Sequence, residues 1–324
     1  MDGLKILVGG DVMLGRNVGH WIRKAGPSYP LGEISGIMKQ GDIVMVNLEC
    51  SLTSSKALWK GERKAFYFGA PGDAIHALKG VDVVSLANNH VLDFDIRGLY
   101  DTLDLLDEAG IVHAGAGRNG LEASRAVFFE RKGIRFGMVA YCDHQEDFSA
   151  GPDKPGINYI DLSEEEAALS RFRADLKKMD AADWPILSLH WGPNMVFSPS
   201  AQFVRLAHAA IEMGYAMIYG HSAHVFHGVE LYKGRPILYS CGDLVDDYYV
   251  DPRFENDHQL LFELHLSGKR LDGIRIHPVF IEDCRTIPAE GERRKKIVER
   301  FALLCSAMGT EVMIDSSGQA EILC

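Results

Sequence analysis

Short apolar runs alternate along the chain with segments of helical periodicity. The runs expected to form strands end in small or charged residues and lie at residues 5–8, 43–48, 83–87, 135–141, 184–189, 216–219, 236–240 and 260–265. Segments 96–109, 164–179, 200–213 and 292–308 carry apolar residues at helical spacing, and Gly110 is placed to end the first of them. Buried strands that alternate with covering helices indicate an α/β fold.

A β-hairpin is predicted late in the chain. Residues 255–267 and 273–281 flank the turn sequence Ser267-Gly268-Lys269-Arg270, and such antiparallel strands indicate a mixed sheet. Low-complexity tracts, composition breaks and repeats that would mark a linker are not found. We therefore expect one domain, with residues 1–285 as its body and residues 286–324 as a carboxy-terminal helix and hairpin packed on it.

Composition narrows the class of protein. The chain has 324 residues, of which 47% are hydrophobic, so it can bury a core. Its net charge of −11 argues against nucleic acid as the main partner, because that partner is bound by basic surface. The six cysteines form no CxxC pair and read as thiols in a reducing compartment. Neither a secretion-signal pattern nor an apolar run of membrane-spanning length is found, so the expected location is cytoplasmic.

Possible metal ligands follow nearly every predicted strand. Ligands of α/β sheets bind at the carboxyl ends of the strands. The residues at these ends are Asp11, Glu49, Asn88, Asn89, His90, His190, His221, His224 and Asp243. Any one of them alone suits a turn or a core position, but their conjunction predicts a site for one or two divalent ions. Carboxylate, amide and imidazole donors together suit Mn, Zn, Fe or Mg, and the oxygen donors also suit Ca.

Residues near these ends have two interpretations each. Arg16, about one turn after Asp11, is either an anion clamp or a surface cation of the first helix. Lys64, Phe66 and Phe68 are candidates for the entrance, although the alternating aromatics of segment 65–68 fit a half-buried strand better. The acidic, aromatic segment 246–249 is expected to be a solvated loop.

Five motifs together resemble a known signature. They are Gly10-Asp11-Val12-Met13-Leu14-Gly15-Arg16, Asn47-Leu48-Glu49, Ala87-Asn88-Asn89-His90, His190-Trp191-Gly192 and Gly220-His221-Ser222-Ala223-His224-Val225. Over about residues 4–250 the chain resembles the CapA family, which is named for poly-γ-glutamate capsule synthesis and is similar in fold to the calcineurin-like metallophosphoesterases. The resemblance implies a four-layer α/β/β/α sandwich of two mixed sheets.

The resemblance also implies residue roles. Asp11 matches the first metal aspartate, Glu49 the bridging carboxylate and Asn89 the metal-binding amide, whereas His90 matches the general acid of phosphoesterases. His190, His221 and His224 match the later metal histidines. We expect one firmly held ion at Glu49, Asn89, His190 and His221, with Asp11 and His224 forming a weaker second position or acting in catalysis. Catalysis is assigned to His90, Asp11 and Asp243, and substrate contacts to Arg16 and Asn88.

The chain departs from the phosphoesterase pattern at three points. Met13 stands where that pattern has a histidine, two residues separate His221 from His224 instead of one, and Asp243 adds a carboxylate where capsule-type members commonly have asparagine. The first departure removes one metal ligand, and the second allows the two histidines to serve different ions.

Three functions remain open from the sequence. The leading one is a divalent-metal-dependent hydrolase that uses metal-activated water on a phosphoester or on an amide or γ-glutamyl peptide. The alternatives are a metal-assisted acid/base enzyme such as a peptide epimerase, and a non-catalytic accessory protein of poly-γ-glutamate synthesis. The expected partner is a small-molecule or peptide substrate, with an anionic one among the options, and the oligomeric state is left open.

Overall fold

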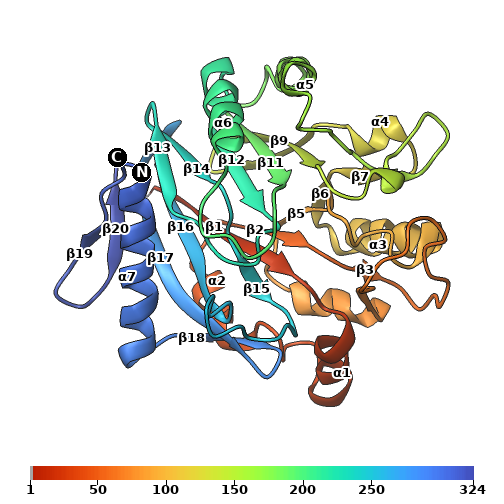
Figure 1. Cartoon of the computed structure of the whole chain (residues 1–324), viewed down its shortest axis with the longest axis horizontal. Helices are drawn as coiled ribbons and strands as arrows, with labels where there is room; N and C mark the ends of the chain where they lie inside the picture. Colours follow the sequence, from red (N-terminus) through yellow and green to blue (C-terminus); the bar gives the residue numbers. More distant parts are fainter. Residues whose placement is uncertain (1–2) are drawn as a thin grey trace.

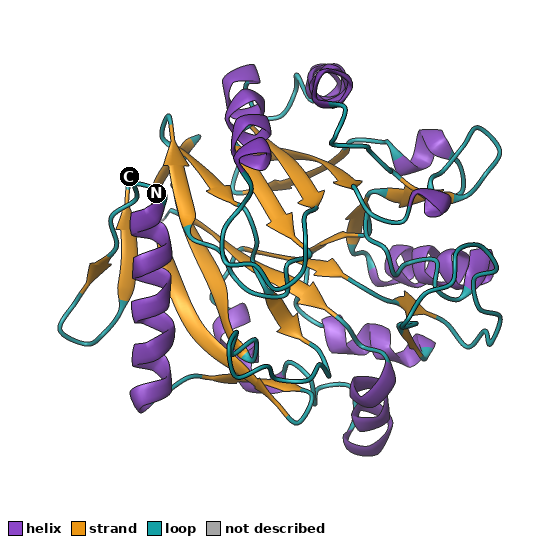
Figure 2. Cartoon of the chain, viewed as in Figure 1, coloured by secondary structure: helices purple, strands orange, loops and turns teal. Residues whose placement is uncertain are grey.

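The computed structural model describes residues 3–324 and contains two large β-sheets packed face to face, with helices on their outer faces (Figures 1 and 2). The first sheet has the order β19 (Met313–Ile314), β20 (Ala320–Leu323), β17 (Arg270–Glu282), β16 (His258–Ser267), β1 (Leu4–Val12), β2 (Ile43–Leu48), β5 (Val83–Ser85) and β6 (Val112–Ala114). Two further strands, β15 (Asp243–Val245) and β18 (Arg285–Pro288), pair with β1 and β17. Strands β1, β2, β5 and β6 are parallel, whereas β16 runs antiparallel to β1, so this sheet is mixed.

The second sheet is also mixed. Its order is β13 (Val229–Tyr232), β14 (Arg235–Leu238), β12 (Met217–His221), β11 (Trp184–His190), β9 (Ile134–Cys142) and β8 (Val127–Arg131). The four inner strands are parallel, and the two edge strands are antiparallel to their neighbours. Small two-stranded sheets join β3 (Ser51–Leu52) to β4 (Gly69–Ala70) and β7 (Ala116–Gly117) to β10 (Gly156–Ile157).

Helices form the outer layers. They are α1 (Arg16–Ala25), α2 (Ser35–Met38), α3 (Asp95–Ala109), α4 (Gly120–Ala123), α5 (Glu165–Lys178), α6 (Ala201–Met213) and α7 (Gly291–Ala307), with short 3-10 turns at Gly32–Ile34, Gly72–Leu78 and Glu146–Phe148. In Figure 1, α5 and α6 lie above the second sheet, and α2 and α3 lie on the far side of the first. The four-layer α/β/β/α sandwich of two mixed sheets is therefore confirmed.

Alternation along the inner strands explains this layering. On β9, Phe136 and Met138 point into the core between the sheets, whereas Val139 and Tyr141 point into a separate core beneath α5 and α6. Successive side chains of a strand face opposite sides, and both sides of this strand are covered. A continuous apolar run is the expected pattern for such a strand.

The predicted elements are in place with small shifts of their ends. Strand β1 extends beyond residue 8 through Gly10 to Val12, so Asp11 lies within a strand and not after one. Gly10 permits this extension, because a Cβ atom there would lie 1.8 Å from the Gly242 carbonyl oxygen. The predicted hairpin is β16 and β17, with β17 beginning at Arg270 instead of residue 273.

The carboxy-terminal residues extend the first sheet. Strand β20 pairs with β17, and β18 begins at residue 285, where we expected the body of the domain to end. On α7, the Phe301 ring lies 6.1 Å from the Phe262 ring of β16 and 6.5 Å from the Phe226 ring. Helix α7 therefore packs on the core that the two sheets share.

The expectation of a strand at residues 65–68 is wrong, because this segment belongs to the loop between β3 and β4. Phe66 is 58% exposed, whereas Phe68 is buried and stacks on the His90 ring at 3.7 Å. The Phe68 amide donates to Asp93 Oδ2 at 2.6 Å. Contacts with His90 and Asp93 therefore hold Phe68 in place.

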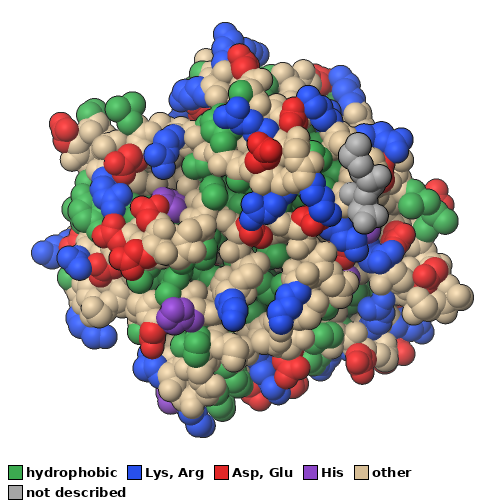
Figure 3. Space-filling view, turned by 180° about the vertical axis from the view of Figure 1, so that it is seen from behind, with side chains coloured by type: hydrophobic (Ala, Val, Ile, Leu, Met, Phe, Trp, Pro, Cys, Tyr) green, Lys and Arg blue, Asp and Glu red, His purple; other side chains and the backbone are tan. Residues whose placement is uncertain are grey.

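The surface is mixed in charge. On the face shown in Figure 3, acidic and basic side chains are interspersed among apolar ones. Within residues 3–324, each helix is too short or too polar to cross a membrane.

Candidate metal centre

The carboxyl ends of β1, β2 and β5 of the first sheet and of β11 and β12 of the second meet at one place, and the first residue of β15 joins them. Strand register brings two pairs of the predicted residues together: Asp11 is opposite Asp243 in the β1–β15 pairing, and His190 is opposite His221 in the β11–β12 pairing. Glu49, Asn89 and His224 arrive from the loops after β2, β5 and β12. Except for the half-buried Asn89, all of these side chains are buried.

Asp11, His190 and His221 form a first group that can hold a metal ion. The Nδ1 atoms of His190 and His221 are 2.8 Å apart, and His221 Nδ1 lies 3.8 Å from Asp11 Oδ1. Asn89 Oδ1 is 3.0 Å from His190 Nε2, the ring nitrogen that faces Glu49 and not His221. Burial lowers the pKa of His221 to about 3, so the ring is neutral, as metal binding requires.

Asp11, Glu49, His224 and Asp243 form a second group, and Asp11 belongs to both. His224 Nδ1 lies 2.9 Å from Asp243 Oδ1 and 3.6 Å from Asp11 Oδ2. This partition differs from our expectation, which joined Glu49 to His190 and His221 and left Asp243 outside the ligands. Glu49 Oε1 lies 3.7 Å from His190 Nε2, so Glu49 stands between the two groups.

The electrostatics of the site fit a bound dication. Burial and the nearby charge of Asp243 raise the pKa of Asp11 to about 7. Burial and the Asp11 carboxylate also raise the pKa of Glu49 well above its usual value. Glu49 Oε2 and Asp243 Oδ2 are buried and accept no hydrogen bond from the residues that the structure describes. Buried carboxylates that repel each other and leave oxygens unpartnered are a fitting environment for a divalent ion.

His90 lies beside this cluster and is held from three sides. Its Nδ1 atom is 2.6 Å from Asp93 Oδ2, and its Nε2 atom is 3.9 Å from Glu49 Oε1. The Lys64 ammonium lies 3.3 Å from His90 Nδ1 and 2.5 Å from Asp93 Oδ1. Lys64 and Phe68 therefore help to position His90, and the former lies deeper in the site than an entrance residue would.

The two residues assigned to substrate contact differ in their surroundings. The Arg16 Nε atom is 3.2 Å from Asp247 Oδ2, and its guanidinium lies over the Phe66 and Phe68 rings, with the side chain 32% exposed. Asn88 is fully buried and donates to Leu48 O at 2.8 Å, while its Oδ1 accepts from the His90 amide at 3.0 Å. These contacts favour a positioning role for Asn88.

Met13 does not reach the cluster. The side chain is buried in the core, and its sulfur accepts from the Gly15 amide at 3.1 Å. His221 and His224 fall into different groups, as their two-residue separation allows.

Sequence reasoning named Asn47 in a motif without giving it a role, and it missed His144. Asn47 donates to Asp11 Oδ1 at 2.7 Å and lies 3.5 Å from His190 Nδ1, so it ties the two sheets together. The His144 ring lies 5.7 Å from the His190 ring and bonds to Ser222 Oγ at 3.1 Å. His144 follows the end of β9, and the strand-end rule applied to this strand would have found it.

Comparisons with known proteins give the family. The profile of the family described as bacterial capsule synthesis protein PGA_cap matches residues 5–248. A probable polyglutamine synthesis accessory protein of Mycobacterium tuberculosis is 33% identical over 293 residues, which cover 76% of this chain and 75% of that protein. The capsule biosynthesis protein CapA of Bacillus anthracis is 29% identical over 253 residues, which cover 76% of this chain and 60% of that protein.

Among solved structures, a hypothetical protein from Thermus thermophilus has the same fold, with a TM-score of 0.50 and 16% identity over 85% of this chain and 98% of that one. The resemblance to the CapA family that the motifs indicated is confirmed by the family profile and by the named relatives. Since the profile spans most of the chain, the protein belongs to the bacterial capsule synthesis protein (PGA_cap) family.

Proposed function

We propose that the protein is a divalent-metal-dependent hydrolase that acts on a phosphoester or on an amide or γ-glutamyl peptide bond. The observation that carries the proposal is the convergence of buried carboxylates and of the histidines His190, His221 and His224 around Asp11, with Glu49 Oε2 and Asp243 Oδ2 left without a donor among the described residues. Such an arrangement costs stability without a ligand. A bound cation would offset this cost.

The proposed ligands are Asp11, Glu49, Asn89, His190, His221 and His224, and the geometry adds Asp243. A divalent ion held there would act as a Lewis acid and lower the pKa of a water molecule in the site. Mn, Zn, Fe, Mg and Ca are all candidates for a donor set that mixes oxygen and imidazole nitrogen.

His90 is the proposed proton donor to the leaving group. Asp93 holds the ring through Nδ1, so the Nε2 atom is the one that faces the cluster. Burial lowers the pKa of His90 to about 4, so Nε2 has to take up a proton from water or substrate before it donates one. A carboxylate that fixes the orientation of an imidazole is a common arrangement for acid/base catalysis. Arg16 is proposed to contact an anionic part of the substrate beside Phe68, because its side chain is partly exposed there.

The role of His90 can be tested with two esters that differ only in leaving group. In the manganese-loaded protein, His90→Ala should slow hydrolysis of phenyl phosphate by about 100-fold and that of p-nitrophenyl phosphate much less, because nitrophenolate leaves without a proton. His20→Ala, on the exposed side of α1, serves as a matched control. An equal loss with both esters would remove His90 from the role of proton donor.

A non-catalytic accessory role is the second candidate. It is supported by the name of the mycobacterial relative, which describes that protein as a probable accessory protein of polyglutamine synthesis. Under this alternative, the metal-loaded protein would turn over neither phosphoesters nor γ-glutamyl peptides, and it would be retained by a polymer synthase in a pull-down. Turnover by the wild type that is lost in His90→Ala would exclude it.

A further inference from the structure

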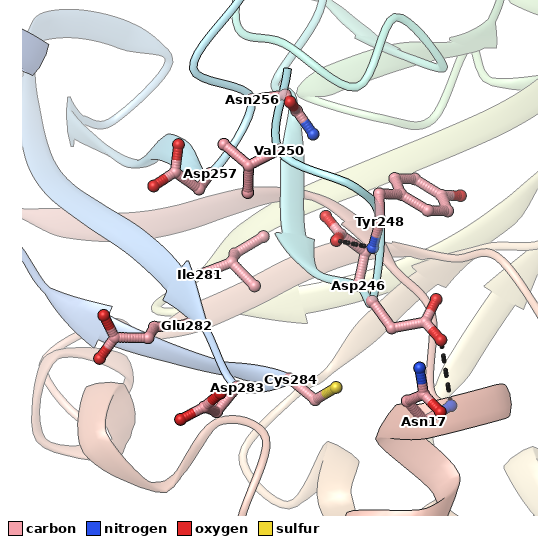
Figure 4. Close-up of a pocket in the computed structure, with 11 residues that line it drawn as sticks. Asn17, Asp246, Tyr248, Val250, Asn256, Asp257, Ile281, Glu282, Asp283 and Cys284 are labelled. Atoms are coloured by element: carbon pink, nitrogen blue, oxygen red, sulfur yellow. Dashed lines mark hydrogen bonds between the residues drawn. The ribbon is translucent and has the colours of Figure 1, made fainter. Parts of the chain in front are cut away.

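A second acidic feature lies next to the metal centre. It is a pocket of about 350 Å³ whose walls come from the segment after β15, the loop before β16, the end of β17 and the start of α1 (Figure 4). Its lining includes the acids Asp246, Asp247, Asp257, Glu282 and Asp283. None of the lining residues is basic, so we refer to it as the acidic pocket.

Two of these carboxylates are buried without a full set of partners. Asp246 Oδ1 accepts from the Tyr248 amide at 2.8 Å, and Asp247 Oδ2 accepts from the Asn17 amide at 3.1 Å. The remaining oxygens, Asp246 Oδ2 and Asp247 Oδ1, are buried and have no donor among residues 3–324. The side chain of Asp247 is only 1% exposed, and Arg16 is the cation that contacts it. Burial and the nearby Asp243 carboxylate raise the pKa of Asp246 well above its usual value. Even with Arg16 beside Asp247, the lining has an excess of acidic side chains, because no basic residue belongs to it.

The arrangement of the acids favours an organic cation over a metal ion. Within the described residues, groups of three or more side chains with ligand atoms close enough for one ion occur only at the metal centre, and the pocket acids belong to neither group. They are spread around a space that Tyr248, Val250 and Ile281 also line. Carboxylates at the rim and apolar walls suit an ammonium or guanidinium group at the end of an aliphatic chain.

The pocket and the metal centre share a wall. Tyr248 lines the pocket, and its ring meets the His224 ring edge to face at 4.9 Å. Asp246 follows directly after β15, the strand that carries Asp243. A molecule that fills the acidic pocket is therefore separated from the metal centre by about the length of one side chain.

We propose that the acidic pocket binds the ammonium or guanidinium group of the substrate while the bond to be cleaved lies at the metal centre. This names a substrate class, namely chains that carry a free amino group or a basic side chain. The assignment of the bond rests on the proposed hydrolase function, whereas cation binding by the pocket does not.

The test uses pentylamine and its neutral isostere 1-pentanol as probes of the intact protein, with and without metal, in an NMR titration. Pentylamine should bind at least about tenfold more tightly than pentanol, and added salt should weaken its binding. The double variant Asp257→Asn/Asp283→Asn should lose about tenfold in pentylamine affinity. The matched control is Glu290→Gln/Glu292→Gln, which removes two exposed acids outside the pocket.

The proposal is overturned if both probes bind equally, if the double variant binds pentylamine like the wild type, or if calcium fills the pocket in place of the amine. Hydrolysis that is unaffected by the double variant and by acetylation of the substrate amine would overturn the pocket assignment and leave the hydrolase proposal standing. If the metal-loaded protein binds the amine but hydrolyses neither phosphoesters nor amide or γ-glutamyl peptide bonds, the hydrolase proposal is overturned and cation binding by the pocket stands.

Discussion

At the scale of single residues, Asp11 is the point where the two ligand groups meet. It receives hydrogen bonds from the Asn47 side chain and the Ser222 amide, so its two oxygens are fixed toward different histidines. The sequence predicted which residues gather here, because strand ends meet at one sheet edge. It did not predict which residues share an ion, because this depends on side-chain direction. Asn47 was named in a motif but given no role, since an in-strand amide carries no distinct signal.

Glu49→Gln should have opposite effects on the metal-free and metal-loaded protein. Burial, and then repulsion by Asp11 and Asp243, raises the pKa of the Glu49 carboxyl group. A neutral side chain of the same size should stabilise the metal-free protein by roughly 1 kcal/mol and reduce the further stabilisation on adding manganese. Urea unfolding with and without manganese measures both effects. Exposed Glu299→Gln is the control, and a destabilised metal-free Glu49→Gln would contradict this account.

At the scale of elements, the apolar runs predicted the inner strands well because both of their faces are covered. Edge strands such as β8 and β13 have polar faces, and two-residue strands such as β3 have no periodicity, so neither class was visible. The loop before β4 was misread for a different reason. Its alternating aromatics match a strand pattern, but Phe68 is placed by the His90 ring and by Asp93.

Glu263 on β16 links three strands of the first sheet and gives a pH-dependent prediction. Its carboxylate lies 2.7 Å from His277 of β17 and 3.1 Å from Lys5 of β1. Burial opposes the charge, but bonds with His277 and Lys5 lower the pKa of Glu263 to about 2. A lowered pKa means that the carboxylate stabilises the fold above its unfolded-state pKa of about 4.5 and that this contribution is lost as the pH falls toward 2.

Glu263→Gln should therefore lower the free energy of unfolding by roughly 2 kcal/mol at pH 6, because Lys5 loses its counter-charge and His277 loses the carboxylate that it contacts. The difference from the wild type should shrink steadily as the pH is lowered from 5 to 3. Urea titrations at several pH values measure this. A difference that stays constant over this range would show that the carboxylate charge is not the cause.

At the scale of the whole molecule, helix α7 connects the two sheets at the end opposite α3 (Figure 1). Phe301→Ala should lower the free energy of unfolding by about 3–5 kcal/mol, because the ring is fully buried between Phe226 and Phe262. Leu303→Ala, on the same helix but 71% exposed, should change it by less than about 0.5 kcal/mol. A single unfolding transition in both variants is expected. Separate unfolding of residues 286–324 would contradict the single-domain interpretation.

The central claim is that Asp11 joins two metal positions, and metal content tests it most directly. Elemental analysis after manganese loading should give up to two ions in the wild type, fewer in His190→Ala and in His224→Ala, and the largest loss in Asp11→Asn, with all variants folded by circular dichroism. Retention of the full metal content by Asp11→Asn would contradict the shared position. Failure of the wild type to take up manganese, zinc, iron, magnesium or calcium would contradict the metal centre itself.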